Sequence, residues 1–192
     1  MKSRKAIIIF SGFIFMILLH NAFAADNVFL SKLQRNLQAY GWSEEEISSF
    51  MNAARHLNWD LIENDTDDVV AYSLQYCRKT NQKTTASEKA QLAYELSVAA
   101  FEMKKIGFDE DAIVRVAVNT SREFVKTLNQ YRKQVTEDGL GDVIRERIRQ
   151  QVCQEGTDAQ KTKFSERIRN RIKTNNQEIG KQMHGTGHGY PY

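Results

Sequence analysis

An all-α fold, a compact helical bundle of about five core helices plus a C-terminal helical hairpin, is what this sequence predicts. Apolar residues recur at spacings of three and four over nearly the whole chain, which is typical of amphipathic helices. The single proline is Pro191, so no proline interrupts the predicted helices. Two glycine-aromatic junctions with capping residues mark where one helix ends and the next begins.

Each core helix is justified by an apolar stripe on one side. The first, over about 27–40, and the second, from residue 44, are followed by a third over about 67–79. The fourth and fifth, over about 88–106 and 110–134, are long enough to cross a small domain. The stripes are, in chain order, Phe29, Leu33 and Leu37; Ile47, Phe50 and Ala54; Val70, Leu74 and Cys77; Leu92, Leu96 and Met103; and Ile113, Val116 and Phe124.

The strongest local motif is a helix junction that occurs twice, 66 residues apart. In each copy a glycine suits the left-handed conformation that ends a helix, and a Ser or Asp two residues later caps the next helix. The aromatic residue between them can pack on the new helix as a hydrophobic staple. The motif indicates either two related helical hairpins or two independent uses of one capping device. Its residues are Gly41, Trp42, Ser43 and Glu46, and then Gly107, Phe108 and Asp109.

The C-terminal part predicts two shorter, arginine-rich helices, over about 142–153 and 158–179, after a glycine-containing break at 138–141. Each combines a narrow isoleucine stripe with arginines four residues apart on one face. One interpretation is a hairpin that buries the isoleucines while the arginine stems cover their edges. The others are contact with a protein partner or a second copy and, less favoured because the stripe has no Trp, docking on an anionic membrane surface. The candidate partner-binding residues are Arg145, Arg149, Arg167 and Arg171.

Residues 1–24 have the features of a signal peptide. A basic start precedes an apolar run over 6–19, and Ala22-Phe23-Ala24 places small residues where a signal peptidase cleaves. The run is shorter than the roughly 20 apolar residues that span a bilayer, which disfavours a membrane anchor. We therefore expect cleavage before Ala25 and a periplasmic or secreted mature protein.

Removal of this leader changes the charge balance. The chain has 27 basic and 24 acidic residues, and the leader holds three of the basic ones and none of the acidic ones. The mature protein is then formally neutral, which disfavours nucleic acid as a partner on bulk charge. Residues 25–112 carry 15 acids and 9 bases, whereas residues 113–192 carry 9 acids and 15 bases. This asymmetry is a possible basis for head-to-tail self-association.

Cysteine and histidine offer few sites. Export permits a disulfide between Cys77 and Cys153. However, Cys77 continues an apolar row, whereas Cys153 lies on the opposite side of its helix from the isoleucines. Whether the two cysteines pair therefore stays open. His184 and His188 can hold a transition metal weakly, because the segment lacks the third and fourth ligands of a structural site. No cofactor is predicted.

Catalytic motifs are absent from the sequence: it has no Gly-x-Ser-x-Gly elbow, His-Glu-x-x-His helix or phosphate-binding glycine loop. The favoured interpretation is an exported, non-catalytic binding or accessory protein of the cell envelope that acts through helix-surface contacts with a macromolecular partner. The alternatives are an exported enzyme with a carboxylate-based site, which leaves no reliable sequence signature, and a weak metal-binding protein.

The same patterns divide the chain into four segments. We expect a signal peptide at 1–24, a helical core domain at 25–136, a basic helical hairpin packed on or extending the core at 137–179, and a disordered tail at 180–192.

Overall fold

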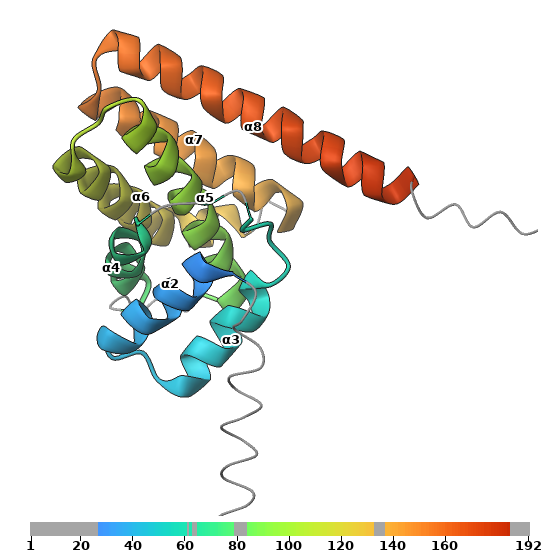
Figure 1. The fold of residues 1–192 in the computed structure, drawn as a ribbon. Coiled ribbons are helices and arrows are strands. Elements are labelled where there is room, and N and C mark those ends of the chain that lie inside the picture. The colour runs from blue at the N-terminus through green and yellow to red at the C-terminus, as the bar shows by residue number, and fades with distance from the viewer. Residues whose placement is uncertain (1–26, 61, 63–64, 79–83, 133–136, 185–192) are drawn as a thin grey trace, which may run out of the picture.

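The computed structural model describes residues 27–60, 62, 65–78, 84–132 and 137–184 (Figure 1). Over these ranges the chain forms seven α-helices and no strand, which confirms the predicted all-α class. The predicted signal peptide lies outside the described residues, as do residues 185–192. The helices are α2 (Val28–Ala39), α3 (Glu44–Ala54), α4 (Asp67–Arg78), α5 (Ala86–Lys105), α6 (Glu110–Tyr131), α7 (Glu137–Glu155) and α8 (Asp158–His184).

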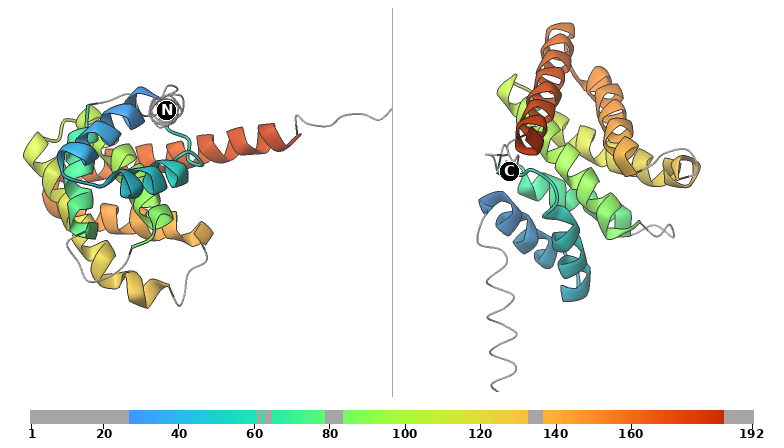
Figure 2. Two further views of the ribbon diagram at one scale, coloured as in Figure 1. Left: turned by 90° about the horizontal axis from the view of Figure 1, so that it is seen from below. Right: turned by 90° about the vertical axis from the view of Figure 1, so that its right-hand side faces the viewer.

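Helix α5 is the centre of the arrangement. It contacts α3, α4, α6, α7 and α8 and buries twelve of its twenty residues. The α2–α3 pair lies on one side of it and the α7–α8 pair on the other (Figure 2). The five helices α2–α6 followed by the α7–α8 hairpin match the predicted order. Helix α8 runs past the packed body, so that its C-terminal part projects away from it (Figure 1).

The two predicted helix junctions have the same backbone geometry. Gly41 has a φ of 79° and Gly107 a φ of 83°, the left-handed region that favours glycine. The backbone N–H of the aromatic residue after each glycine donates to the carbonyl five residues back. These hydrogen bonds run from Trp42 to Leu37 at 3.1 Å and from Phe108 to Met103 at 3.1 Å. These bonds make both junctions Schellman motifs, which satisfy the last carbonyl groups of α2 and α5.

The predicted capping side chains start the next helices. The Ser43 hydroxyl accepts from the Glu46 N–H at 3.2 Å, and the Glu46 carboxylate accepts from the Ser43 N–H at 2.8 Å, which completes a capping box. The Asp109 carboxylate accepts from the Ala112 N–H at 2.6 Å. Both junction aromatics are buried, as expected for staples.

Two helix boundaries differ from the sequence prediction by five residues. Helix α7 begins at Glu137, so the expected break at 138–141 is helical. A Cβ on Gly141 would lie 2.9 Å from a Glu95 carboxylate oxygen, so glycine there permits close packing of α7 on α5 and does not end a helix. Helix α8 continues to His184, five residues beyond the expected end at 179, into the segment expected to be disordered.

Candidate functional site

Two buried carboxylates on α5 face the C-terminal hairpin. Glu95 and Glu102 are only 3% and 6% exposed, although they stand seven residues apart on a helix of otherwise mostly small and apolar residues. A charge removed from water in this way is costly unless it is paired and hydrogen-bonded. Both are paired, and every partner arginine comes from α7 or α8.

Arg145 of α7 holds the first carboxylate. Its Nη1 donates to Glu95 Oε1 at 2.5 Å, and its Nη2 donates to Asp142 in the preceding turn of α7. Gln91 Nε2 donates to the same Glu95 oxygen at 2.9 Å. The Glu95 carboxylate therefore accepts hydrogen bonds from its own helix and from α7.

Two arginines of α8 hold the second carboxylate. Arg167 Nε donates to one oxygen of Glu102, and Arg171 Nη1 donates to the other at 3.0 Å. The Arg171 guanidinium also lies 5.3 Å from the centre of the Phe101 ring, within the range of a cation–π contact. We call these five residues, Glu95, Glu102, Arg145, Arg167 and Arg171, the carboxylate clamp.

The four arginines predicted to bind a partner are therefore placed unequally. Arg145 and Arg171 turn toward α5, with side chains 25% and 11% exposed, while Arg167 is 41% exposed although it pairs with Glu102. Only Arg149 lacks a partner on α5; it is 53% exposed and pairs with Glu146 one turn away. Part of the charge asymmetry between the two halves is thus neutralised within one molecule.

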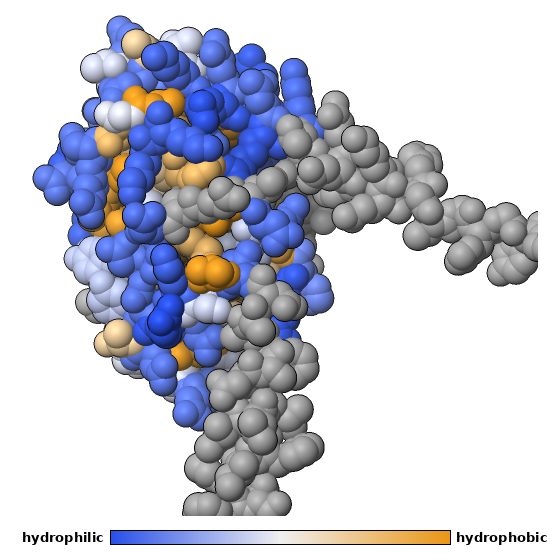
Figure 3. Space-filling model, viewed as in Figure 1, coloured by the Kyte–Doolittle hydropathy of each residue, from blue (hydrophilic) through white to orange (hydrophobic). Residues whose placement is uncertain are grey.

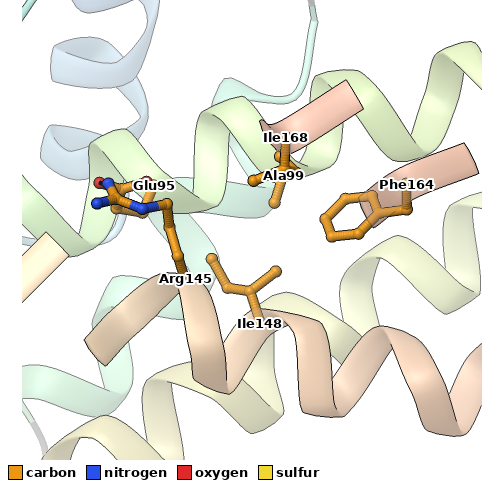
Figure 4. A pocket seen from close by; sticks show the side chains of 6 residues that line it. All are labelled: Glu95, Ala99, Arg145, Ile148, Phe164 and Ile168. Atoms are coloured by element: carbon orange, nitrogen blue, oxygen red, sulfur yellow. Dashed lines mark hydrogen bonds and ion pairs between the residues drawn. The ribbon is translucent and has the colours of Figure 1, made fainter. Parts of the chain in front are cut away.

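A small cavity lies where α5, α7 and α8 meet, and Glu95 and Arg145 meet at one end of it (Figure 4). The apolar side chains of Ala99, Ile148, Phe164 and Ile168 complete its lining. Its volume of about 10 Å³ is near the minimum for one water molecule, far below the several hundred Å³ of a small-molecule site. Burial raises the pKa of the Glu95 carboxyl to about 7, because desolvation outweighs the opposing effects of Arg145 and Gln91.

A second feature is a row of tyrosines at the end of α2 and along α4, here called the tyrosine cluster: Tyr40, Tyr72 and Tyr76. The ring of Tyr72 lies 6.1 Å from that of Tyr40 and 6.4 Å from that of Tyr76, centre to centre. Tyr40 follows α2, the other two lie on α4, and Arg122 of α6 donates to the Tyr76 hydroxyl at 2.8 Å. Tyr40 and Tyr72 are 43% and 42% exposed, so the row faces solvent.

Large hydrophobic side chains are seldom exposed among the residues that the structure describes. Figure 3 shows one face as mostly hydrophilic, with apolar side chains visible only in small separate patches. Among the side chains that the structure describes, the large hydrophobic residues that stay exposed are Tyr40, Tyr72 and Val28. Two of these three therefore lie in one place.

Both cysteines are free in the structure, and the disulfide between Cys77 and Cys153 stays a prediction. Cys77 is buried on α4, and Cys153 is exposed on α7. Burial raises the pKa of the Cys77 thiol to about 12, which keeps it in the unreactive protonated form. The two thiols therefore differ strongly in chemical accessibility.

The two predicted metal ligands, His184 and His188, stay a prediction. His188 lies outside the described residues, and the side chain of His184 is not described. Among the described side chains, no group of three or more His, Cys, Asp or Glu is placed to hold a metal ion.

Within the part of the chain that the structure describes, no helix combines the length and apolarity needed to cross a bilayer.

Sequence reasoning missed both the buried carboxylates and the tyrosine cluster. For Glu95 a signal existed, because the other residues of 92–100 are apolar or small on every side of the helix and leave no polar face for this carboxylate. For Tyr72 and Tyr76 the signal was their spacing of four residues beside the apolar row of α4. Their proximity to Tyr40 depends on how α2 packs against α4.

Comparison of the chain with protein-family models, with curated proteins and with solved structures finds no match.

Proposed function

We propose that this chain is an exported, non-catalytic binding protein of the cell envelope that contacts a protein partner through its helical surface. The tyrosine cluster is the observation that carries the proposal. Tyrosine is enriched at protein interfaces because it combines a large apolar ring with a polar tip and loses little conformational entropy on binding. The leader-like sequence of residues 1–24 supports the location outside the cytoplasm.

Neighbouring side chains already hold the rings of the tyrosine cluster in place. Tyr76 is held by a hydrogen bond from Arg122, whose guanidinium also lies 4.6 Å from the Tyr76 ring centre. Tyr72 packs edge-on against Tyr76, with their ring planes at 88°. A surface whose rings are already fixed by neighbours has less freedom to lose when a partner binds.

The arginines take a different part in this proposal than the sequence suggested. Arg145 and Arg171 act as internal anchors of the hairpin, because their charges are directed at Glu95 and Glu102. Arg149 keeps an exposed side chain and stays available for a partner. Any cationic contribution to binding is therefore expected to come from Arg149 and the outer part of Arg167.

Site-specific photo-cross-linking in the native host tests the proposed contact. A cross-linking amino acid at Tyr72 should give a discrete adduct with an envelope protein, whereas one at Gln154, an exposed position on α7, should give none. Purification of the partner then allows a direct measurement. Tyr72→Ala should weaken its binding about 5- to 30-fold, which corresponds to a loss of about 1–2 kcal/mol from one contributing interface side chain. Equal adducts at both positions, or none at Tyr72, would contradict the proposed surface.

The expected location has its own test. The protein purified from its native host should begin at Ala25, and a chain still beginning at Met1 would remove the argument for export. This outcome is independent of the cross-linking result, so the surface and the location can fail separately.

A further inference from the structure

The α7–α8 hairpin is attached to the rest of the molecule by two kinds of contact. Its apolar side chains Ile144, Ile148, Val152 and Phe164 are no more than 2% exposed. The carboxylate clamp adds charge pairs along α5, one to α7 through Glu95 and two to α8 through Glu102. On α5 the hairpin is therefore held at two charged points seven residues apart, and a further ion pair joins Glu155 of α7 to Arg115 of α6 at 2.9 Å.

The Glu95 contact is the more enclosed of the two. The carboxylate lies at the edge of the small cavity between α5, α7 and α8, and Gly141 of α7 packs directly over it. Separation of the hairpin from α5 would open this cavity and return the carboxylate to water.

We propose that the α7–α8 hairpin is a releasable arm whose docking on α5 is controlled by a proton on Glu95, the hairpin being held more firmly when this carboxyl is neutral and released more readily when it is ionised.

The direction of the effect follows from the two environments of the carboxyl. In the docked state burial raises the Glu95 pKa to about 7, and in a released state open to water the pKa returns toward 4.5, its ordinary value. Between about pH 4.5 and about pH 7, the docked state therefore holds a proton that the released state has lost. Linkage then requires docking to weaken as pH rises through this window, and to change little above it.

The charged groups that face Glu95 leave this direction unchanged. From α7 these are Arg145, which favours the ionised form, and Asp142, which opposes it, and α5 itself contributes the neutral Gln91. The cavity side chains from α8, Phe164 and Ile168, are apolar. When Glu95 is neutral, Arg145 keeps its pair with Asp142, so no guanidinium is left without a counter-ion. A protonated Glu95 is thus compatible with the docked hairpin.

Native-state hydrogen exchange on the full chain tests the arm without any substitution. After correction for chemical exchange rates, amides of α7 and α8 should open more often than the core amides of α2 and α4, because the hairpin opens without global unfolding. The opening constant of the hairpin should rise roughly ten- to hundred-fold between pH 5 and pH 8. Hairpin amides that open only together with α2 and α4, or equally at both pH values, would overturn the proposal.

Two variants assign the effect to Glu95. Glu95→Gln cannot ionise and should remove most of the pH dependence of hairpin opening. Glu88→Gln is the matched control on the same helix, because Glu88 pairs with Arg132 outside the hairpin and its pKa is lowered, so that it stays ionised between pH 5 and pH 8. The pH dependence should persist in this control. A pH dependence that survives in Glu95→Gln would assign the proton to another group and contradict the proposed mechanism.

Discussion

Adjacent residues on α5 hold the two ends of the described chain by different chemistry. The ring of Tyr94 meets Trp59 edge-on at 5.4 Å, and Trp59 in turn stacks on Phe29 of α2 at 5.7 Å. The next residue, Glu95, instead receives Arg145 from α7. The N-terminal helices are thus attached through aromatic packing and the C-terminal hairpin partly through charge, so only the second attachment responds directly to a proton.

This difference shows how one helix can serve as a fixed support and as a docking surface. Aromatic packing depends on apolar area and ring geometry, neither of which changes between pH 5 and pH 8. A buried carboxylate contributes little net stability while it is ionised, because desolvation offsets most of the attraction to its partner. The N-terminal helices are therefore expected to stay in place under conditions that loosen the hairpin.

The largest effect is expected from the aromatic attachment. Trp59 is 3% exposed, and its indole N–H donates to the Ala54 carbonyl at 2.7 Å. Trp59→Ala should lower the free energy of unfolding by about 3–5 kcal/mol through the lost packing and the cavity left behind. Urea denaturation measures this loss. Asn52→Ala, at an exposed position on α3, serves as the control and should change stability by less than about 0.5 kcal/mol.

A smaller and more local effect is expected at the charged attachment. Glu102→Ala leaves Arg167 and Arg171 without their shared carboxylate and should cost about 2–3 kcal/mol, less than a fully buried pair because Arg167 is partly exposed. Hydrogen exchange should show the loss mainly in α8. Glu146→Ala removes the exposed pair with Arg149 and an exposed hydrogen bond from Gln150, and should cost less than about 1 kcal/mol. Equal losses would mean that burial does not distinguish the two pairs.

The helix junction next to the hairpin should give an effect of about 1–2 kcal/mol. Gly107→Ala places a Cβ at a φ of 83°, where an L-residue is strained although no neighbouring atom lies within 4 Å. The matched substitution Gly41→Ala should cost a similar amount, because its backbone geometry is nearly the same. Thermal or urea denaturation measures both losses. Unequal losses would show that the two junctions differ in more than their backbone.

Thiol reactivity should distinguish the two regions with almost no change in stability. At pH 8, Cys153 on the exposed side of α7 should react quickly with a disulfide reagent, whereas Cys77, with a pKa raised to about 12 by burial, should react only after unfolding. Cys153→Ser should abolish the fast phase and change stability by less than about 0.5 kcal/mol. A fast phase from both thiols would contradict the burial of Cys77.

The sequence predicted the helices and their junctions well, because the information is local. A glycine, an aromatic residue and a capping Ser or Asp act on the backbone within a few residues, and the structure confirms this at Gly41 and Gly107. The prediction was wrong at 138–141, where Gly141 was interpreted as a helix breaker. Its actual role depends on Glu95, 46 residues earlier in the chain, so local reasoning could not find it.

By itself the sequence determined the all-α class, the order of the helices and the caps between them, because periodicity and capping act over one or two helical turns. Only the tertiary structure decided which charges meet and which rings cluster. Helix packing turned Arg145 and Arg171 toward two acids of α5, and brought Tyr40 beside two tyrosines of α4. Such pairings depend on the relative rotation and distance of helices far apart in the chain, which no local pattern encodes.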